Sequence, residues 1–311
     1  MIGAPAVSVW GESRFEVATV RLAAVEPIRV VERRGRTDES VHRVHGVAVR
    51  DGEVVASAGD PGLVTFFRSS AKPLQALFLA RARPDLDDRL VAIACASHRA
   101  EPEQIQAVRD LLAAGGATED DLELGLQEGR PPERIYHNCS GKHAGMLAVC
   151  RARGWPTEGY RLPDHPLQQE ILREVAAAAD ATPATGVDHC SVVTFALPLE
   201  RMAHALSRLT ELDGGGRIAG AMRDHPQLIG GEGSLDTRLM QAHPGWLAKG
   251  GAEGLLCGIA PDGAGFALKT EDGAFRALGP ALASFFPGLD EFARVPVENS
   301  RGEEVGEVVA G

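Results

Sequence analysis

The chain has 311 residues, of which 44% are hydrophobic and 24% are charged, and this composition excludes disordered and fibrous classes. Its net charge of −11 repels phosphate backbones and anionic lipid, so we expect no nucleic-acid and no membrane partner. No apolar run reaches the roughly 20 residues of a membrane span, and residues 1–17 lack the basic and apolar regions of a secretory leader. Five cysteines, an odd number, favour a reducing compartment, so the sequence predicts a soluble, cytoplasmic protein.

The first predicted elements are strands over residues 16–57. Within them Asp51-Gly52 joins two alternating segments, 45–50 and 53–57, and this pattern predicts a β-hairpin. From about residue 70 to 240 the pattern is mainly helical. The clearest helices each begin beside a proline and are predicted over 102–113, 166–179 and 198–209.

Two short apolar runs inside the helical region, 91–95 and 191–195, fit either strands or buried helical turns. The Gly-rich residues 213–216 predict a loop. Strands return at 254–260 and 265–269, and a helix is predicted near 277–286.

Tight turn signals at both ends of the chain predict an antiparallel sheet assembled from the two termini, with helices inserted between them. We therefore predict an α+β fold in a single two-lobed domain that spans residues 1–311. The sheet lobe covers about 10–70 and 245–311, and the mainly helical lobe covers about 70–245.

Lysine is rare in this sequence. Of the 32 cationic residues, four are lysine: Lys72, Lys142, Lys249 and Lys269. Codon bias explains the rarity but not the positions, which are all apolar or Gly-rich. Arginine stays protonated, whereas a desolvated lysine can lose its proton and act as a base. We treat the four lysines as functional candidates and expect at least one of them to be structural.

The first motif that contains candidate catalytic residues is Arg68-Ser-Ser-Ala-Lys-Pro73. A proline is tolerated only in the first turn of a helix, so the helix begins near Ser69 or Ser70. Ser69 and Lys72 then share one face of that turn, where a neutral amine can take the hydroxyl proton. The alternative is that Ser69 or Ser70 is only an N-cap.

The second motif is Lys249-Gly250-Gly251. A lysine on an apolar strand before two glycines predicts an edge strand that a substrate approaches closely; the alternative is a surface strand that ends in a glycine turn. With the upstream Ser-x-x-Lys it is similar to the serine acyl-transfer motifs of β-lactamases and penicillin-binding proteins. Their intermediate Ser-Asp-Asn is absent, and the chain has Cys95-Ala96-Ser97-His98 instead.

The third motif places a thiol, an amine and an imidazole within five residues, at Cys139, Lys142 and His143. Together with Cys190, these residues fit a tetrahedral zinc site with an open position. A cysteine nucleophile is another interpretation. The alternative is structural, since free cysteine is usually a small buried hydrophobe and lysine must lose its proton before it binds a metal.

These blocks, in this order, resemble the rhizobial-type L-asparaginases, the third class, also called the asparaginase II family. The resemblance covers most of the chain, and its Asn-Cys-Ser-Gly-Lys-His block is highly specific. The matching segments are Glu39-Ser40 with His42, Gly59-Asp60, Arg68-Ser69 to Lys72, Cys95 to His98, Asn138 to Leu147, Pro163 to Pro166, Gln168 to Glu170, Gly186 to Asp188, Cys190-Ser191, Lys249, Gly251 to Gly254, Ala267 to Lys269 and Asp272 to Ala274.

The resemblance implies a three-layer, serine β-lactamase/glutaminase-like fold. It also implies hydrolysis of L-asparagine to L-aspartate and ammonia through a Ser–Lys acyl-enzyme, in a protein that is a homodimer. By residue, it implies that Ser69 with Lys72 and Ser97 with Lys249 are catalytic, that His98, Asn138, Asp188 and Gly251 bind substrate, and that Cys139, Lys142 and Cys190 hold one zinc ion that assists substrate binding. The chain departs from the family pattern at Arg99-Ala100, His189 and Gly250.

Two other functions remain open from the sequence. The first is a glutaminase or another acyl-serine hydrolase, for example one that acts on β-lactams. The expected lack of a leader counts against an exported β-lactamase. The second is a non-catalytic protein that binds zinc or an amino acid, although such a protein has no need of two serines paired with two lysines. The sequence also leaves open which Ser–Lys pair supplies the nucleophile.

Overall fold

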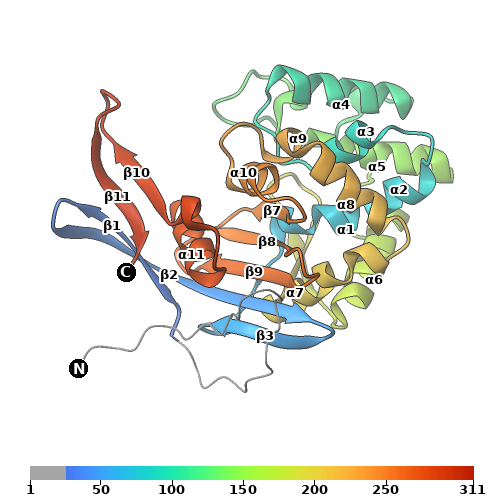
Figure 1. Ribbon diagram of the computed structural model, residues 1–311. Helices are drawn as coiled ribbons and strands as arrows, with labels where there is room; N and C mark the ends of the chain where they lie inside the picture. Colours follow the sequence, from blue (N-terminus) through green and yellow to red (C-terminus); the bar gives the residue numbers. More distant parts are fainter. Residues whose placement is uncertain (1–25) are drawn as a thin grey trace.

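The computed structural model describes residues 26–311 (Figure 1). The predicted strand residues 16–25, the first part of the predicted sheet lobe and the segment without a leader pattern lie outside this range. Within it, none of the helices combines the length and the apolar character that crossing a bilayer requires. All five cysteines are free and buried, in line with the expectation of no disulfide framework.

The large sheet is antiparallel and draws its strands from both ends of the chain, as the sequence predicts. Its strand order is β10-β11-β1-β2-β9-β8-β7, and β3 pairs with β2. The strands are β1 (Ile28–Arg34), β2 (Thr37–Arg50), β3 (Glu53–Ala58), β7 (Leu247–Gly251), β8 (Leu255–Ile259), β9 (Gly265–Thr270), β10 (Arg294–Glu298) and β11 (Glu304–Ala310). The β2–β9 pairing, from Val44↔Thr270 to Val49↔Gly265, joins the two ends of the chain.

The predicted hairpin is confirmed. β2 and β3 pair through Arg50↔Glu53 across the Asp51-Gly52 turn. Both turn residues have positive φ, +53° at Asp51 and +83° at Gly52, which matches the right-handed twist of the flanking strands. The sequence did not predict β10 and β11, because nearly all of their side chains are exposed or half-buried and several are charged.

The chain between β3 and β7 is mainly helical, as predicted. Its helices are α1 (Lys72–Gln75), α2 (Leu77–Ala82), α3 (Asp88–Ala94), α4 (Pro102–Ala114), α5 (Ser140–Arg153), α6 (Pro166–Ala179), α7 (Leu199–Ser207), α8 (Gly215–Asp224), α9 (Pro226–Gly230) and α10 (Leu235–Ala242). The apolar run 91–95 belongs to α3 and its C-cap. The loop predicted at 213–216 is shorter than expected, because α8 begins at Gly215.

Helices cover both faces of the large sheet. On one face, a Cβ added at Gly46 of β2 would lie 3.0 Å from Phe285 of α11 (Leu278–Phe285). A Cβ added at Gly265 of β9 would lie 1.9 Å from the Ala203 carbonyl oxygen of α7. Gly265 pairs with Val49, and alternate residues of a strand face opposite ways, so α7 and α11 pack on opposite faces (Figure 1).

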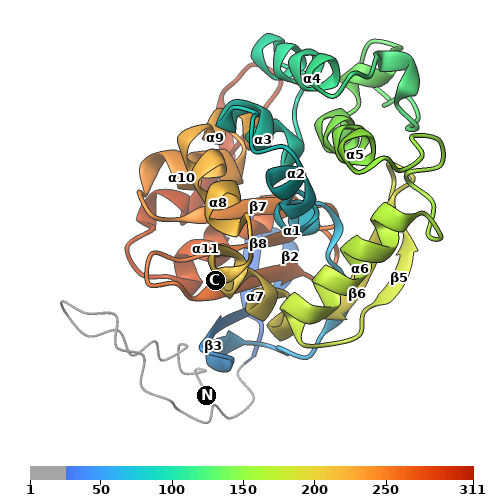
Figure 2. The same ribbon diagram turned by 90° about the vertical axis from the view of Figure 1, so that its right-hand side faces the viewer.

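A second, three-stranded sheet lies beside α6 (Figure 2). It has the order β4-β6-β5, with β4 (Val64–Phe66), β5 (Ala184–Val187) and β6 (Val193–Pro198). The apolar run at 191–195 therefore contributes to a strand. This sheet positions two residues of the candidate site, because β4 leads into Arg68 and β5 ends directly before Asp188.

Candidate functional site

A cavity of about 460 Å³ lies where β7, the start of α10 and the turn after α3 meet, and it is called the polar cavity below because serine, lysine, arginine, asparagine and aspartate residues line it. Ser69, Ser97 and Lys249 all line it, so the fold brings together three of the four predicted catalytic residues. Lys72, the fourth, is completely buried. The other lining residues are Arg99, Asn138, Gly230, Gly233, Ser234, Leu235, Asp236, Gly250, Gly251, Ala252, Leu256, Phe275, Arg276 and Leu278.

Ser69 lies in a single 3₁₀ turn, Arg68–Ala71, which continues into α1. Pro73 occupies the first turn of α1, as predicted. The alternative that Ser69 or Ser70 is an N-cap is wrong, since neither helical segment has a side-chain cap. The Ser70 hydroxyl instead donates a hydrogen bond of 2.7 Å to the carbonyl oxygen of Lys249. This bond ties the turn that carries Ser69 to β7.

The backbone before Ser69 is strained. Arg68 has φ +48°, in the left-handed region that a non-glycine residue seldom adopts. Its Nε donates to Asp188 Oδ1 at 2.7 Å, and the Asp188 side chain is almost buried. The Arg68–Asp188 ion pair thus joins the strained turn beside Ser69 to the end of β5.

The side-chain nitrogen of Lys72 reaches Ser97. Lys72 Nζ donates to Ser97 Oγ at 3.0 Å and also to the Ala96 carbonyl oxygen. Ser97 is held in turn by its own N–H, which donates to the Ile229 carbonyl oxygen at 2.7 Å. Within residues 26–311, neither Ser69–Lys72 nor Ser97–Lys249 is joined by a side-chain hydrogen bond. The structure therefore connects Lys72 to the other serine of the cavity.

Lys249 lies on β7, which is an edge strand of the large sheet, as predicted from Lys-Gly-Gly. Its Nζ donates to the Gly250 carbonyl oxygen at 2.8 Å and lies 3.5 Å from Asp236 Oδ2. Complete burial lowers the pKa of Lys249 to about 8; Asp236 opposes this shift and the nearby charge of Lys72 adds to it. A lysine with this pKa can exchange a proton near neutral pH.

Asp236 was not identified from the sequence. It lies in the first turn of α10, and its carboxylate accepts hydrogen bonds from the Ser234 hydroxyl at 2.7 Å and the Gly250 N–H at 3.0 Å. Burial opposes its charge, but Lys249 and these donors keep the pKa of Asp236 below its ordinary value. An acidic residue at a helix start is common, so nothing in the sequence links Asp236 to Lys249.

Of the four predicted substrate-binding residues, Asn138 and Gly251 line the cavity. Gly251 has no room for a side chain, because a Cβ there would lie 2.8 Å from Ser70 Oγ and 3.2 Å from the Phe67 carbonyl oxygen. The glycine is therefore required for β7 to pack against the turn that carries Ser69.

His98 and Asp188 do not line the cavity but lie behind its wall. His98 is fully buried, with Nε2 at 2.8 Å from Ser140 Oγ and Nδ1 accepting the Ala100 N–H. Burial lowers the pKa of His98 to about 3, so the ring is neutral and Nε2–H donates to Ser140. In the structure these two residues position their neighbours.

The Asn-Cys-Ser-Gly-Lys-His block begins α5, and its glycine lets two helices approach closely. A Cβ at Gly141 would lie 2.2 Å from the Ile93 carbonyl oxygen of α3. This contact brings the start of α5 beside the segment after α3, where the His98 N–H donates to the Asn138 carbonyl oxygen at 3.2 Å. The block therefore helps to place both Asn138 and Ser97.

The three predicted metal ligands, Cys139, Lys142 and Cys190, form one buried cluster. Lys142 Nζ donates to Cys190 Sγ at 3.0 Å. A hydrogen bond from the Cys139 thiol, with help from Lys142, holds the pKa of Cys190 well below its usual value despite burial. Burial opposes the charge of Lys142, but Cys190, Cys139 and Asp188 raise its pKa. Both shifts favour the charged forms of Cys190 and Lys142.

Two sulfur donors and an amine in mutual contact suit the preference of zinc for thiolate and nitrogen ligands. The amine has to lose its proton first, because an ammonium group has no lone pair. In the described part of the chain, no three His, Cys, Asp or Glu side chains form a metal-binding group, so a zinc site here depends on Lys142. His189 is exposed and stacks on His137, with ring centroids 5.9 Å apart.

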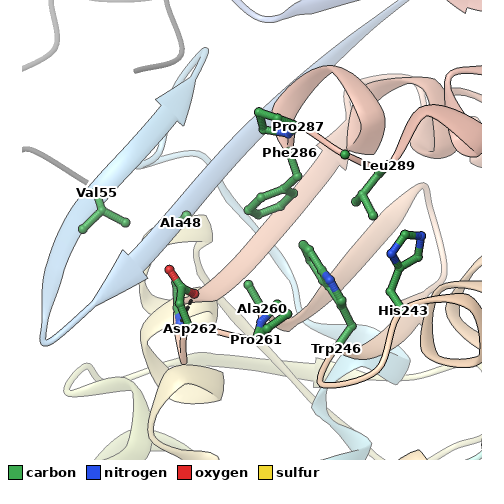
Figure 3. Close-up of a pocket in the computed structure, with 12 residues that line it drawn as sticks. Ala48, Val55, His243, Trp246, Ala260, Pro261, Asp262, Phe286, Pro287 and Leu289 are labelled. Carbon is green, nitrogen blue, oxygen red and sulfur yellow. Dashed lines mark hydrogen bonds between the residues drawn. The ribbon is translucent and has the colours of Figure 1, made fainter. Parts of the chain in front are cut away.

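A second cavity, of about 200 Å³, is mainly apolar (Figure 3). Trp246 and Phe286 both line it and pack edge to face, with ring centroids 5.0 Å apart. Its lining holds no serine, cysteine or lysine. Because it offers no nucleophile, the polar cavity is the candidate active site.

Comparison with known proteins identifies the family. The chain matches the model of the L-asparaginase II family over residues 30–310 and therefore belongs to that family. No curated protein matches the chain.

Among solved structures, similarity is low. The native form of Mglu is 13% identical, with a TM-score of 0.42 over 78% of this chain and 61% of Mglu. A LovD6 mutant of simvastatin synthase from Aspergillus terreus is also 13% identical, with a TM-score of 0.31 over 78% of this chain and 86% of the synthase. The chain thus spans about three fifths of the length of Mglu. Neither similarity enters the argument that follows.

Proposed function

We propose that the protein is an L-asparagine amidohydrolase that releases L-aspartate and ammonia through an acyl-enzyme. The observation that carries this proposal is that Ser69, Ser97 and Lys249 line one cavity, while the buried Lys72 donates a hydrogen bond to Ser97. A nucleophilic hydroxyl beside an amine that can exchange protons is the arrangement that acyl transfer requires. Membership of the L-asparaginase II family supports an amide of this kind as the substrate.

In the proposed reaction, Ser69 Oγ attacks the side-chain amide carbon of the substrate, and its hydroxyl proton passes to the neutral amine of Lys72. The carbon–nitrogen bond then breaks, the leaving nitrogen takes a proton, and ammonia departs from a β-aspartyl ester. Water attacks the ester carbon, which releases L-aspartate and restores Ser69. Lys249, acting with Ser97, is the second proton-transfer group.

Ser97 is the rival nucleophile, because its hydroxyl is the one in contact with Lys72, at 3.0 Å. The two assignments differ in which peptide carries the acyl group. Mass spectrometry of enzyme quenched during turnover locates the β-aspartyl ester on residue 69 or on residue 97. An ester at Ser97 transfers the role of nucleophile to that residue.

Zinc is also part of the proposal, and Cys139, Lys142 and Cys190 are the residues that would hold it. When bound, it would supply a positive charge that assists binding of the amino-acid substrate. Asp188 lies between this cluster and the cavity, since it is paired with Arg68 and raises the pKa of Lys142. A charge at the cluster would therefore act, through Asp188 and Arg68, on the electrostatic potential beside Ser69.

The remaining expectations from the resemblance belong to this proposal as well. They are a β-lactamase/glutaminase-like three-layer fold, a single two-lobed domain, a homodimer and a cytoplasmic location. Size-exclusion chromatography with light scattering tests the homodimer.

Ammonia release from L-asparagine, compared with L-glutamine, tests the proposed activity. We expect a higher kcat/KM for L-asparagine. A preference for L-glutamine would make the enzyme a glutaminase, and turnover of a chromogenic β-lactam alone would indicate another acyl-serine hydrolase. Binding of L-asparagine without turnover of any of the three would support a binding protein instead.

A further inference from the structure

Arg276 is a cavity residue that none of the sequence motifs singled out. It lies in the 3₁₀ turn Phe275–Ala277, between β9 and α11, and it lines the same cavity as Ser69, Ser97 and Lys249. Its side chain is 43% exposed, although its nearest partners are buried. An ordinary surface arginine is not held in place by two buried side chains, so the fixed orientation of Arg276 indicates a specific role.

Two side chains of the large sheet hold the guanidinium group. Arg276 Nε donates to His42 Nε2 at 3.0 Å, and Arg276 Nη1 forms an ion pair with Glu32 Oε2. His42 and Glu32 are each only about 4% exposed. Both stand on the same face of the sheet, because His42 pairs with Val30 and Glu32 is two residues further along β1.

The hydrogen-bonding roles of the two His42 ring nitrogens follow from these bonds. Since His42 Nε2 accepts the Arg276 N–H, the ring N–H is on Nδ1, which donates to Asp272 Oδ2 at 2.6 Å. Asp272 lies four residues before Arg276, so the network closes on itself. In the described part of the chain, Arg276 Nη2 has no hydrogen-bond partner, and its two N–H donors remain available for a ligand.

An arginine fixed in this way suits a carboxylate. The planar guanidinium presents parallel N–H donors that match the two oxygens of a carboxylate, and fixing its orientation beforehand reduces the entropy cost of binding. The other two cations of the cavity are less suited: Arg99 donates to the Glu232 carbonyl oxygen, and Lys249 is engaged by Asp236 and Gly250.

We propose that Arg276, positioned by His42 and Glu32, binds the α-carboxylate of the substrate and so selects amino-acid amides over simple amides. This inference rests on the proposed amidohydrolase function and adds a substrate-recognition residue to it. It assigns no chemical step to Arg276; His42 and Glu32 act only through it.

The test compares two amides in wild type and Arg276→Ala. L-Asparagine carries the α-carboxylate, whereas 3-aminopropanamide has the same amine and amide but no carboxylate. We expect Arg276→Ala to raise the KM for L-asparagine by about 10- to 100-fold, the range for loss of a charge-assisted pair, and to leave kcat/KM for 3-aminopropanamide unchanged. Equal losses for both amides, or no loss for L-asparagine, would overturn the proposal.

Three further variants separate recognition from folding. Arg276→Lys keeps the charge without the planar fork, and we expect only partial rescue of KM. Glu32→Gln should raise the KM for L-asparagine by a smaller factor and again spare 3-aminopropanamide. Arg43→Ala is the matched control, since Arg43 is an exposed, ion-paired arginine next to His42 that does not line the cavity; its KM should equal that of wild type.

A separate measurement keeps this inference distinct from the proposed activity. If wild type hydrolyses neither amide, the amidohydrolase proposal fails, and calorimetric binding of L-aspartate and of β-alanine then tests Arg276 alone. The inference holds if Arg276→Ala weakens only the binding of L-aspartate. It is overturned if L-aspartate fails to bind wild type or binds both proteins equally.

Discussion

Lys249 and Lys142 are both buried, and burial should discharge both of them, yet the structure shifts them in opposite directions. Lys249 lies at the cavity with one carboxylate neighbour, Asp236, which is also engaged by Ser234 and Gly250. Lys142 lies against two thiol groups and within the influence of Asp188. The pKa of Lys249 falls to about 8, whereas that of Lys142 rises above its ordinary value.

The difference shows that burial alone does not decide what a lysine can do; the number and freedom of its anionic partners do. Lys249, with one partner and the repelling charge of Lys72, can exchange a proton near neutral pH. The neighbours of Lys142 raise its pKa and so favour its charged form. We therefore expect changes around Lys249 to reduce kcat and changes around Lys142 to act mainly on metal content and KM.

The largest effect is expected from Ser69→Ala. Loss of the nucleophile of a covalent mechanism costs several powers of ten, so kcat should fall by at least about 10⁴-fold. Circular dichroism should show an unchanged melting temperature, because Ser69 makes no side-chain hydrogen bond within residues 26–311. Near-wild-type turnover in this variant, with loss of turnover in Ser97→Ala, would make Ser97 the nucleophile.

Lys249→Arg should have the next largest effect. The variant keeps the positive charge but cannot release its proton at neutral pH. If Lys249 transfers protons, kcat should fall by about 10²- to 10⁴-fold. If instead Lys249 serves only as a fixed charge beside Asp236, most of the turnover will survive. Steady-state kinetics at saturating L-asparagine distinguishes the two roles.

The pH profile sharpens the comparison further. If Lys249 acts as the second proton-transfer group in its neutral form, kcat should rise as the pH increases through about 8. Asp236 favours the charged amine, so Asp236→Asn should lower the pKa of Lys249 and move the rising limb by about 1–3 pH units to lower pH. A limb that stays in place, in a variant that remains folded, would show that another group controls it.

The smallest effect on turnover is expected at the thiol cluster. Zinc has to displace the protons of Lys142 and the thiols, so its affinity should fall as the pH is lowered. Protein purified without chelator should contain zinc near one equivalent, and Cys190→Ser should lose it. The matched control is Cys150→Ala, which removes another buried thiol of the same region.

Chelation should raise KM and leave kcat nearly unchanged if zinc assists only substrate binding. Equal zinc content in wild type and Cys190→Ser, by elemental analysis, would remove Cys190 from the ligand set. A fall in kcat with unchanged KM would contradict the difference drawn between the two lysines.

The fourth lysine of the sequence, Lys269, lies outside the polar cavity. Lys269 lies on β9 opposite His45 of β2 and donates to the Thr270 carbonyl oxygen. The rarity of lysine thus drew attention to Lys72 and Lys249 of the candidate site and to Lys142 of the thiol cluster. It did not distinguish these three from Lys269.

The sequence by itself determined the features that rest on local chemistry. The Asp51-Gly52 turn, the proline-marked helices and the edge strand of Lys249 follow from backbone preferences of a few neighbouring residues. The resemblance, carried by blocks such as Asn138 to Leu147, also named residues that prove to lie around one cavity and one adjacent cluster. Local patterns did not reveal β10 and β11, because most of their side chains are exposed or half-buried and, of the two strands, Val308 alone is fully buried.

Only the tertiary structure decided which of these residues touch. It shows that Lys72 contacts Ser97 and that Asp236 contacts Lys249. It also shows that Arg276 lines the polar cavity, whereas His98 and Asp188 do not. The contacts around the cavity join different elements, which are neighbours in the chain for Asp236 and Lys249 and far apart for Arg276 and His42. Their geometry is set by packing of α3 on α5 and of the 3₁₀ turn on β7. The protonation of a buried lysine depends on such neighbours, so it could not be obtained from the sequence.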